Sequence, residues 1–244
     1  MNVFLTAEWK HLINLTYEVE PSLLEEYLPK GIEVDTALNG KAHVSLVAFD
    51  FLNTRVKGIS IPFHVNFPEI NLRFYVRYKG QVGVVFIREF VPKYCIALVA
   101  NRIYNEPYLA TSMTSSLQIT NDEVTSHHQF KYKGQIFDIQ TTGTNSLFTP
   151  EETTTENYFK EHTWGFGTAH SGKTKCYKVE HPVWRIYPFK NFELRIEFGK
   201  LYGKKWEFLG HTQPTYKVFA EGSAVKVFGA LTLTEFDKLY SQSV

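Results

Sequence analysis

Hydrophobic and polar residues alternate most regularly along residues 64–78, HVNFPEINLRFYVRY. Successive side chains of an extended strand point to opposite faces, so this alternation predicts a β-strand with two different faces. The apolar face carries Ile70, Leu72, Phe74 and Val76. The polar face carries Glu69, Asn71, Arg73, Tyr75 and Arg77. Periodicity alone favours a solvated outer face for these polar residues. The alternative is a polar stripe that lines the inside of a barrel and meets a ligand.

The same kind of alternation predicts strands over 11–19, 32–37, 41–55, 82–90, 108–119, 123–132, 135–142, 174–180, 183–198, 215–219 and 223–228. Short helices are predicted over 21–28, 92–105, 149–162, 201–208 and 234–240. Asn39-Gly40 predicts a hairpin between strands 32–37 and 41–55, and Lys79-Gly80-Gln81 predicts a second hairpin, which joins the strand that ends at Tyr78 to strand 82–90. Lys133-Gly134 predicts a turn between strands 123–132 and 135–142. Cys95 falls on the apolar face of its helix, where we expect it to be part of the core. Many strands and few helices indicate an α+β fold with a large antiparallel sheet, closed into a barrel.

The composition narrows the class of protein. With 244 residues and 43% hydrophobic residues, we expect one globular domain over residues 1–244. A net charge of +1 gives no general electrostatic reason to bind nucleic acid or a membrane. Two cysteines, the absence of a signal-peptide pattern and the absence of a long apolar run indicate a cytoplasmic protein. The sequence leaves open whether the protein forms a homo-oligomer.

The run from Gly167 to Thr174, GTAHSGKT, fits the phosphate-binding Walker A pattern. That site requires a strand before the loop and a helix after it, whose N-terminus holds the phosphates. Here the residues before the run read as helix and residues 174–180 alternate like a strand. We therefore expect a hairpin loop with no role in nucleotide binding.

Metal and nucleophile motifs are missing. Adjacent His127 and His128 would point to opposite faces of a strand, and no His-Glu-x-x-His or Cys-x-x-Cys is present. No Gly-x-Ser-x-Gly turn that would present a serine nucleophile is found either. We expect neither a metal nor a cofactor.

Several short motifs, in order, resemble the YqjF-like family, an uncharacterised family related to acetoacetate decarboxylase. The central motif is an acidic residue, here Glu69, followed by Asn71, Arg73, Tyr75 and Val76, and then by Gly83 to Phe86. The supporting segments are Trp9, residues 28–35 with Asp35, Arg102 to Tyr104, Pro107-Tyr108, residues 158–162 with Glu161, and residues 181–184. The resemblance covers nearly the whole chain and implies the acetoacetate decarboxylase-like fold.

This resemblance also favours the inward orientation of the polar stripe. Acetoacetate decarboxylase reacts through a lysine that forms a Schiff base, but the matching positions here are Tyr108 and Leu109. We therefore expect the same scaffold without that nucleophile. The predicted ligand-binding residues are Glu69, Asn71, Arg73 and Tyr108, with Arg102 and Glu161 as further candidates. For Arg102 and Glu161 we favour an internal ion pair or hydrogen bond that stabilises the barrel.

Three functional hypotheses follow. The first is a central cavity that binds a small organic acid or carbonyl compound. The second is an enzyme, a lyase or hydrolase, in which Glu69 transfers a proton and Arg73 holds an anionic substrate. The third is a structural or interaction domain whose interior is filled by its own side chains.

Overall fold

The computed structural model describes residues 1–103, 105, 107–160 and 162–240. Its strands are β1 (Val3–Val19), β2 (Glu33–Val34), β3 (Ala42–Val56), β4 (Phe67–Tyr78), β5 (Gln81–Val91), β6 (Tyr108–Ala110), β7 (Met113–Ile119), β8 (Glu123–Tyr132), β9 (Gln135–Thr144), β10 (Trp164–Thr168), β11 (Thr174–Glu180), β12 (Phe189–Arg195), β13 (Tyr216–Phe228) and β14 (Leu231–Thr232). Its helices are α1 (Tyr94–Ile103), α2 (Thr155–Lys160), α3 (Phe198–Tyr202) and α4 (Leu233–Tyr240), with 3₁₀ turns η1 (Pro21–Leu23), η2 (Glu25–Tyr27) and η3 (Lys204–His211).

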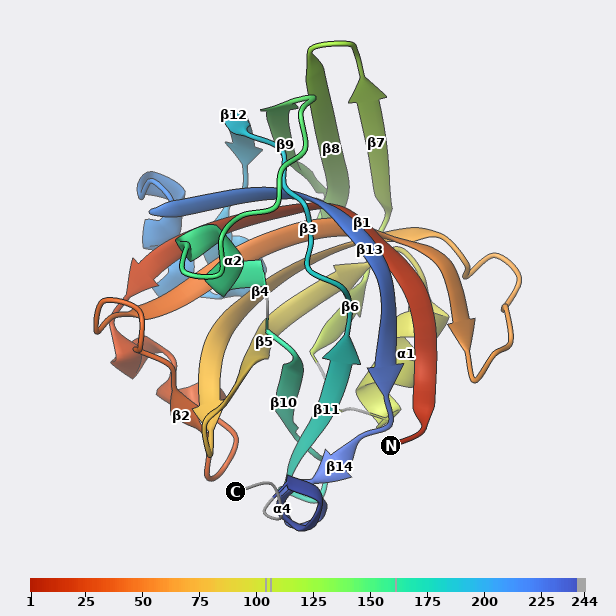
Figure 1. The fold of residues 1–244 in the computed structure, drawn as a ribbon, viewed down its shortest axis with the longest axis vertical. Helices are drawn as coiled ribbons and strands as arrows, with labels where there is room; N and C mark the ends of the chain where they lie inside the picture. The colour runs from red at the N-terminus through yellow and green to blue at the C-terminus, as the bar shows by residue number, and fades with distance from the viewer. Residues whose placement is uncertain (104, 106, 161, 241–244) are drawn as a thin grey trace.

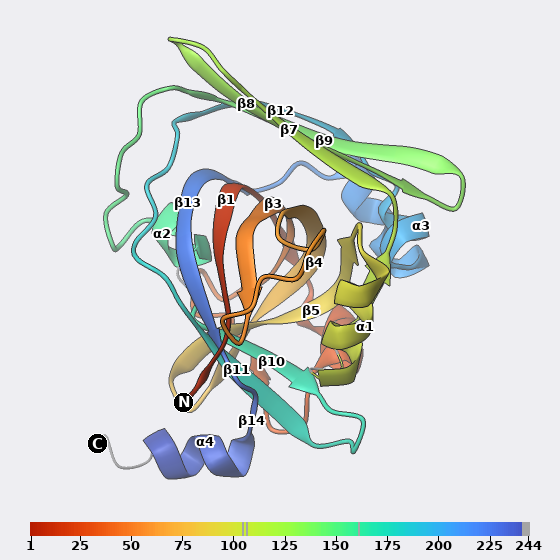
Figure 2. The ribbon, with the colours of Figure 1, turned by 90° about the vertical axis from the view of Figure 1, so that its right-hand side faces the viewer.

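The larger of two sheets has the strand order β2-β4-β3-β1-β13-β11-β10-β5-β6, with β14 paired to β11 (Figure 1). Because β4 also pairs with β5, the pairings run in a closed circuit through β4, β3, β1, β13, β11, β10 and β5. All pairs are antiparallel except those of β5 with β10 and with β6. The second sheet, β12-β9-β8-β7, crosses one end of the larger sheet, and α4 lies at the other end (Figure 2). The predicted α+β fold with a large, mostly antiparallel sheet is confirmed.

The strand β4 is buried on both faces. Its apolar residues Ile70, Leu72, Phe74 and Val76 join the main core, together with side chains of the second sheet and of α3 and η3. On the opposite face, Glu69 and Asn71 are only 2% and 1% exposed. The solvated orientation, which periodicity alone favours, is therefore wrong for this strand.

Two of the tight turns explain how neighbouring strands are joined. Lys79-Gly80 connects β4 to β5, and Lys133-Gly134 connects β8 to β9; all four residues have positive φ. Two consecutive left-handed residues form the turn whose twist suits a hairpin, and glycine adopts the second position without strain. These two hairpins lie where the sequence predicts them.

The hairpin predicted across Asn39-Gly40 is wrong. Strand β2 pairs with β4, not with β3, and the Asp35 N–H donates to the Tyr75 carbonyl oxygen over 3.0 Å. Asn39 and Gly40 instead close a local turn in which the Gly40 N–H donates to the Thr36 carbonyl oxygen. The side chain of Asp35 holds this segment to β4, a long-range contact that local turn chemistry cannot anticipate.

Other boundaries also differ from the prediction. Residues 21–28 form two 3₁₀ turns, only 189–195 of the predicted strand 183–198 are extended, and 216–228 form one strand instead of two. The helix predicted over 149–162 is limited to α2 in the described residues. Cys95 is exposed on α1, not in the core.

The Walker A-like run lies in a hairpin. Residues 164–168 form β10, which the sequence reading missed, and Thr168 pairs with Thr174 at the start of antiparallel β11. A strand therefore follows the loop where a phosphate-binding loop requires a helix. The predicted hairpin loop is confirmed.

The adjacent histidines point in opposite directions. His128 is fully buried with its Nε2 3.5 Å from Asp50 Oδ1, whereas His127 Nε2 lies 3.8 Å from Asp138 Oδ1 and is partly exposed. Within the described part of the chain, no group of three or more His, Cys, Asp or Glu residues could hold a metal ion. In the same part, no helix has the length and apolar character needed to cross a membrane.

Candidate functional site

A cavity of about 260 Å³ lies against the polar face of β4. Its described polar lining includes Glu69, Asn71 and Arg73 of β4, Glu89 of β5 and Tyr108 of β6. Most of its remaining wall is aromatic or aliphatic, with Trp9, Phe49, Phe51, Phe67, Phe86 and Ile96 as examples. The structure thus brings four sequence-predicted residues, Glu69, Asn71, Arg73 and Tyr108, to one apolar-walled cavity.

Glu69 is held in a defined orientation. Its Oε1 accepts a 2.8 Å hydrogen bond from Asn71 Nδ2, and its Oε2 accepts a 3.1 Å hydrogen bond from the Tyr108 hydroxyl. A carboxylate oxygen needs a donor, so Asn71 must direct its NH₂ group, not its oxygen, toward Glu69. The carboxyl group of Glu69 is therefore fixed from two strands, β4 and β6.

Tyr108 is itself fixed by α1. The Asn101 side chain accepts from the Tyr108 N–H over 3.1 Å and donates to the Tyr108 carbonyl oxygen over 3.2 Å. Strand β6 pairs in parallel with β5, and this register places Tyr108 beside Glu89. The short strand β6 therefore delivers a phenol to the polar end of the cavity.

Arg73 differs from the other polar residues of the cavity. Among the described residues, it has no ion-pair or hydrogen-bond partner, and its Nε is shielded from solvent without an acceptor. A half-buried guanidinium without a carboxylate loses hydration that no protein contact replaces. Such a group in a cavity wall is suited to an anionic ligand.

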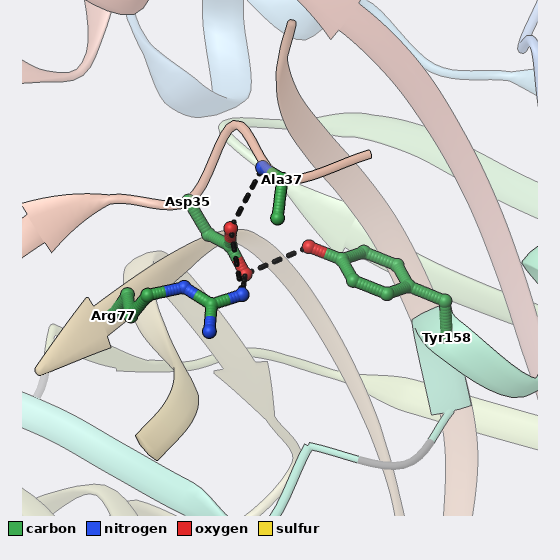
Figure 3. Close-up of polar contacts among 4 residues, drawn as sticks. All are labelled: Asp35, Ala37, Arg77 and Tyr158. Atoms are coloured by element: carbon green, nitrogen blue, oxygen red, sulfur yellow. Dashed lines mark hydrogen bonds and ion pairs between the residues drawn. The ribbon is translucent and has the colours of Figure 1, made fainter. Parts of the chain in front are cut away.

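Arg77 shows the contrasting arrangement four residues further along the same face. Its Nη2 lies 3.1 Å from Asp35 Oδ2, and Asp35 also accepts from the Ala37 N–H and the Tyr158 hydroxyl (Figure 3). Burial would raise the pKa of Asp35, but the donors of Ala37, Tyr158 and Arg77 outweigh it and lower that pKa. Arg77 thus belongs to a structural network, and Arg73 does not.

The helix α2 covers the part of the polar face of β4 that carries Tyr75 and Arg77. Tyr75, next to Arg73 on that face, has its hydroxyl 2.6 Å from Ser45 Oγ. Asn14 Nδ2 donates to both the Tyr75 hydroxyl and the Phe159 carbonyl oxygen, at 3.3 Å each. Phe159 is fully buried, with its ring 5.1 Å from that of Tyr75. Tyr75 and Arg77 therefore have a structural role. Tyr75 packs against α2 directly, and Arg77 is linked to α2 through Asp35.

His162 lies at the border between the two halves. Its ring centre lies 4.6 Å from that of Tyr75 with the two rings tilted by 50°, and both ring nitrogens are shielded from solvent. Burial, with the positive charges of Arg73 and Arg77 nearby, lowers the pKa of His162 to about 3. The imidazole is neutral at physiological pH, so it adds no charge to this end of the cavity.

Two predicted residues and one missed residue complete the comparison. The side chain of Arg102 and the whole of Glu161 lie outside the described residues. Glu89 was missed, although it and Arg88 are the two charged residues of the otherwise apolar strand 82–90, and Glu89 pairs in register with Asn71. An acid in a predicted strand of mainly apolar residues is the signal that could have identified it. No lysine is found among the described residues that line the cavity.

A family model designated DUF2071, described as an uncharacterised conserved protein, matches residues 6–224. The uncharacterised protein YqjF of Bacillus subtilis is 33% identical over 108 residues, and the match spans 44% of each chain. The aligned part is thus less than half the length of this curated relative.

Solved structures share the fold at low sequence identity. An acetoacetate decarboxylase-like enzyme from Sphingomonas wittichii aligns with a TM-score of 0.65 and 12% identity, covering 95% of this chain and 94% of the other. The enduracididine biosynthesis enzyme MppR, solved with pyruvate, aligns with a TM-score of 0.62 and 11% identity, covering 97% of this chain and 93% of MppR. Acetoacetate decarboxylase from Legionella pneumophila aligns with a TM-score of 0.59 and 14% identity, covering 95% of this chain and 89% of the decarboxylase.

Proposed function

Because the chain belongs to the DUF2071 family of uncharacterised conserved proteins, we propose its function from the cavity: it binds a small organic acid or carbonyl compound there. The unpaired guanidinium of Arg73 carries this proposal, since a carboxylate would supply the partner that the described residues do not. The pyruvate bound to the similarly folded MppR is consistent with a cavity that accepts such compounds.

The proposed mode of binding does not involve an imine. A Schiff base needs an uncharged lysine amine next to the carbonyl carbon. The described wall of the cavity offers Glu69, Asn71, Arg73 and Tyr108 instead, which hold a ligand by charge and hydrogen bonds. Borohydride reduction of the protein with a keto acid should then leave its mass unchanged, and a mass increase equal to the reduced adduct would contradict this mode.

Calorimetric titration with a panel of carboxylates and neutral carbonyl compounds tests the proposal. At least one acid is expected to bind, and Arg73→Met should weaken it at least tenfold, the loss of one charge-assisted contact. Arg55→Met is the matched control because Arg55 is exposed and lies outside the described lining of the cavity. Equal weakening by both substitutions, or no binding by any compound, would overturn the proposal.

A second candidate function is acid–base catalysis on the bound compound. The orientation of Glu69 by Asn71 and Tyr108 favours it, because a general acid or base must be positioned at the reacting atom. If an acid that binds is also turned over, Glu69→Gln should lower kcat at least 100-fold while binding is kept. Full turnover by this variant would exclude the role of Glu69.

A further inference from the structure

We infer that the ligand is an amphipathic carboxylic acid, with its carboxylate at Arg73 and an apolar body along the aromatic part of the cavity. This inference rests on the proposed function and specifies its ligand. It excludes very short acids such as pyruvate as the best-fitting compounds.

The shape of the cavity is the first argument. Both Phe67 and Arg73 line it, and both belong to β4. Arg73 lies six positions after Phe67 along the extended strand, a distance of roughly 20 Å. A compound that contacts only Arg73 would leave most of this length unfilled.

The chemistry of the wall is the second argument. Beyond the polar group near Arg73, most of the wall consists of side chains such as Trp9, Phe49, Phe51 and Phe67, and Thr54 and His64 are polar exceptions. Phe51 and Phe67 stack with their ring centres 4.7 Å apart, and Trp9 meets Phe49 and Phe51 edge to face. Water against such a wall has few hydrogen-bond partners, so an apolar group that displaces it gains free energy.

The volume sets the size of the apolar body. At about 30 Å³ for each non-hydrogen atom, the share of one water molecule in the liquid, 260 Å³ holds roughly nine such atoms. A straight-chain acid of about this size, or an aryl acid such as phenylacetate, fills the space. Acetate and pyruvate are too small to do so.

The rim of the cavity is the third argument. Ile59 and Ile61, which precede β4, line the cavity and are 68% and 46% exposed. On the facing side, Cys95 and Ile96 of α1 also line it, and Cys95 is exposed. An apolar rim suits a compound whose apolar end lies toward the opening and whose charged end lies inside, at Arg73.

Calorimetric titration with straight-chain carboxylates from acetate to decanoate, each below its micelle-forming concentration, tests this inference. Affinity should rise roughly fourfold for each added methylene until the cavity is full, and then level off. Octan-1-ol, which has the tail without the charge, should bind at least tenfold more weakly than octanoate.

A cavity-filling substitution adds a second readout. Ile96→Phe places a larger side chain at the rim, so it should weaken octanoate at least tenfold and leave the affinity for butyrate unchanged. Ile119→Phe makes the same change at an exposed position of β7 and should alter neither affinity. The wild-type series is informative even if the Ile96 variant does not fold.

The outcomes separate the two proposals. Equal affinities for acetate and octanoate, both lost in Arg73→Met, would overturn this inference and leave the proposed function intact. Binding of octan-1-ol as tight as that of octanoate would overturn the placement of a carboxylate at Arg73. No binding by any acid would overturn both proposals.

Discussion

The Tyr158 hydroxyl donates a 2.8 Å hydrogen bond to Asp35 Oδ2, which joins α2 to the segment after β2 across 123 positions of the chain. Both residues lie in segments that carry the family resemblance. Asp35 is 2% exposed, so its charge depends on the donors that surround it (Figure 3). This contact identifies the α2 side of the sheet as a structural region, distinct from the cavity.

Removing this hydroxyl should destabilise the fold. Tyr158→Phe keeps the ring but deletes one donor to a buried carboxylate, and should lower the free energy of unfolding by roughly 1–2 kcal/mol. Urea denaturation at neutral pH measures it. Tyr132→Phe, whose hydroxyl has no hydrogen-bond partner among the described residues, should change stability by less than about 0.5 kcal/mol. Equal effects of the two substitutions would contradict the role of the Asp35 contact.

The two arginines on the polar face of β4 should respond differently to the same substitution. Arg77→Met leaves buried Asp35 without its ion partner, and a loss of roughly 1–2 kcal/mol is expected because Arg77 itself is partly exposed. Arg73→Met removes a charge that has no partner among the described residues, so stability should be unchanged within about 0.5 kcal/mol or should rise. Urea denaturation of both variants decides the matter, and a larger loss for Arg73→Met would show that Arg73 is structural.

His162 should make the protein less stable in mild acid. Its pKa falls from 6.5 in the unfolded chain to about 3 in the folded protein, so between these values the unfolded state binds more protons. The contribution of His162 to the free energy of unfolding is fully present above about pH 6.5 and declines as the pH falls toward 3. Roughly 1–2 kcal/mol of stability is lost by pH 5.

The variant His162→Phe isolates this effect because phenylalanine keeps the ring contacts with Tyr75 and Tyr158 and cannot be protonated. Its unfolding free energy should change less between pH 7.5 and pH 5 than that of the wild type. Asp35 also has a lowered pKa, so its contribution is lost at lower pH, below the ordinary aspartate value near 4. An identical pH dependence in this window for both proteins would refute the assignment to His162.

Gly222 of β13 should tolerate no side chain. Its φ is +79°, and a Cβ there would overlap the backbone carbonyl group of Trp9 on β1. Gly222→Ala should therefore destabilise the protein by roughly 3–5 kcal/mol, from backbone strain and steric overlap together. Gly80→Ala is the matched control because Gly80 has a similar φ of +80° with open space around it, and only about 1 kcal/mol is expected. Thermal unfolding should rank the two variants in this order.

The sequence was most informative where local geometry decides the structure. The alternation around Arg73 identified β4, and the Lys79-Gly80 and Lys133-Gly134 turns identified two hairpins, because side-chain period and turn conformation are local properties. The face of β4 that meets the cavity could not be derived this way. Both of its faces are buried, so alternation distinguishes two environments without saying which encloses the cavity.

Long-range contacts account for the remaining errors. The pairing of β2 with β4 depends on Asp35 and Arg77, which are 42 positions apart. The position of Glu89 in the cavity depends on its register with Asn71. The exposure of Cys95 depends on which side of α1 faces the sheet, and periodicity leaves this undetermined when the helix borders an apolar cavity.

The double burial of β4 also constrains how this family can vary in length. A one-residue insertion exchanges the two faces of a strand, and on β4 neither face is open to water. Here a single inserted residue before Glu69 would turn Arg73 into the hydrophobic core and Leu72 toward the cavity. Natural insertions and deletions near this strand should therefore accumulate in the flanking loop at 57–66, leaving the spacing of the Glu69, Asn71 and Arg73 positions unaltered.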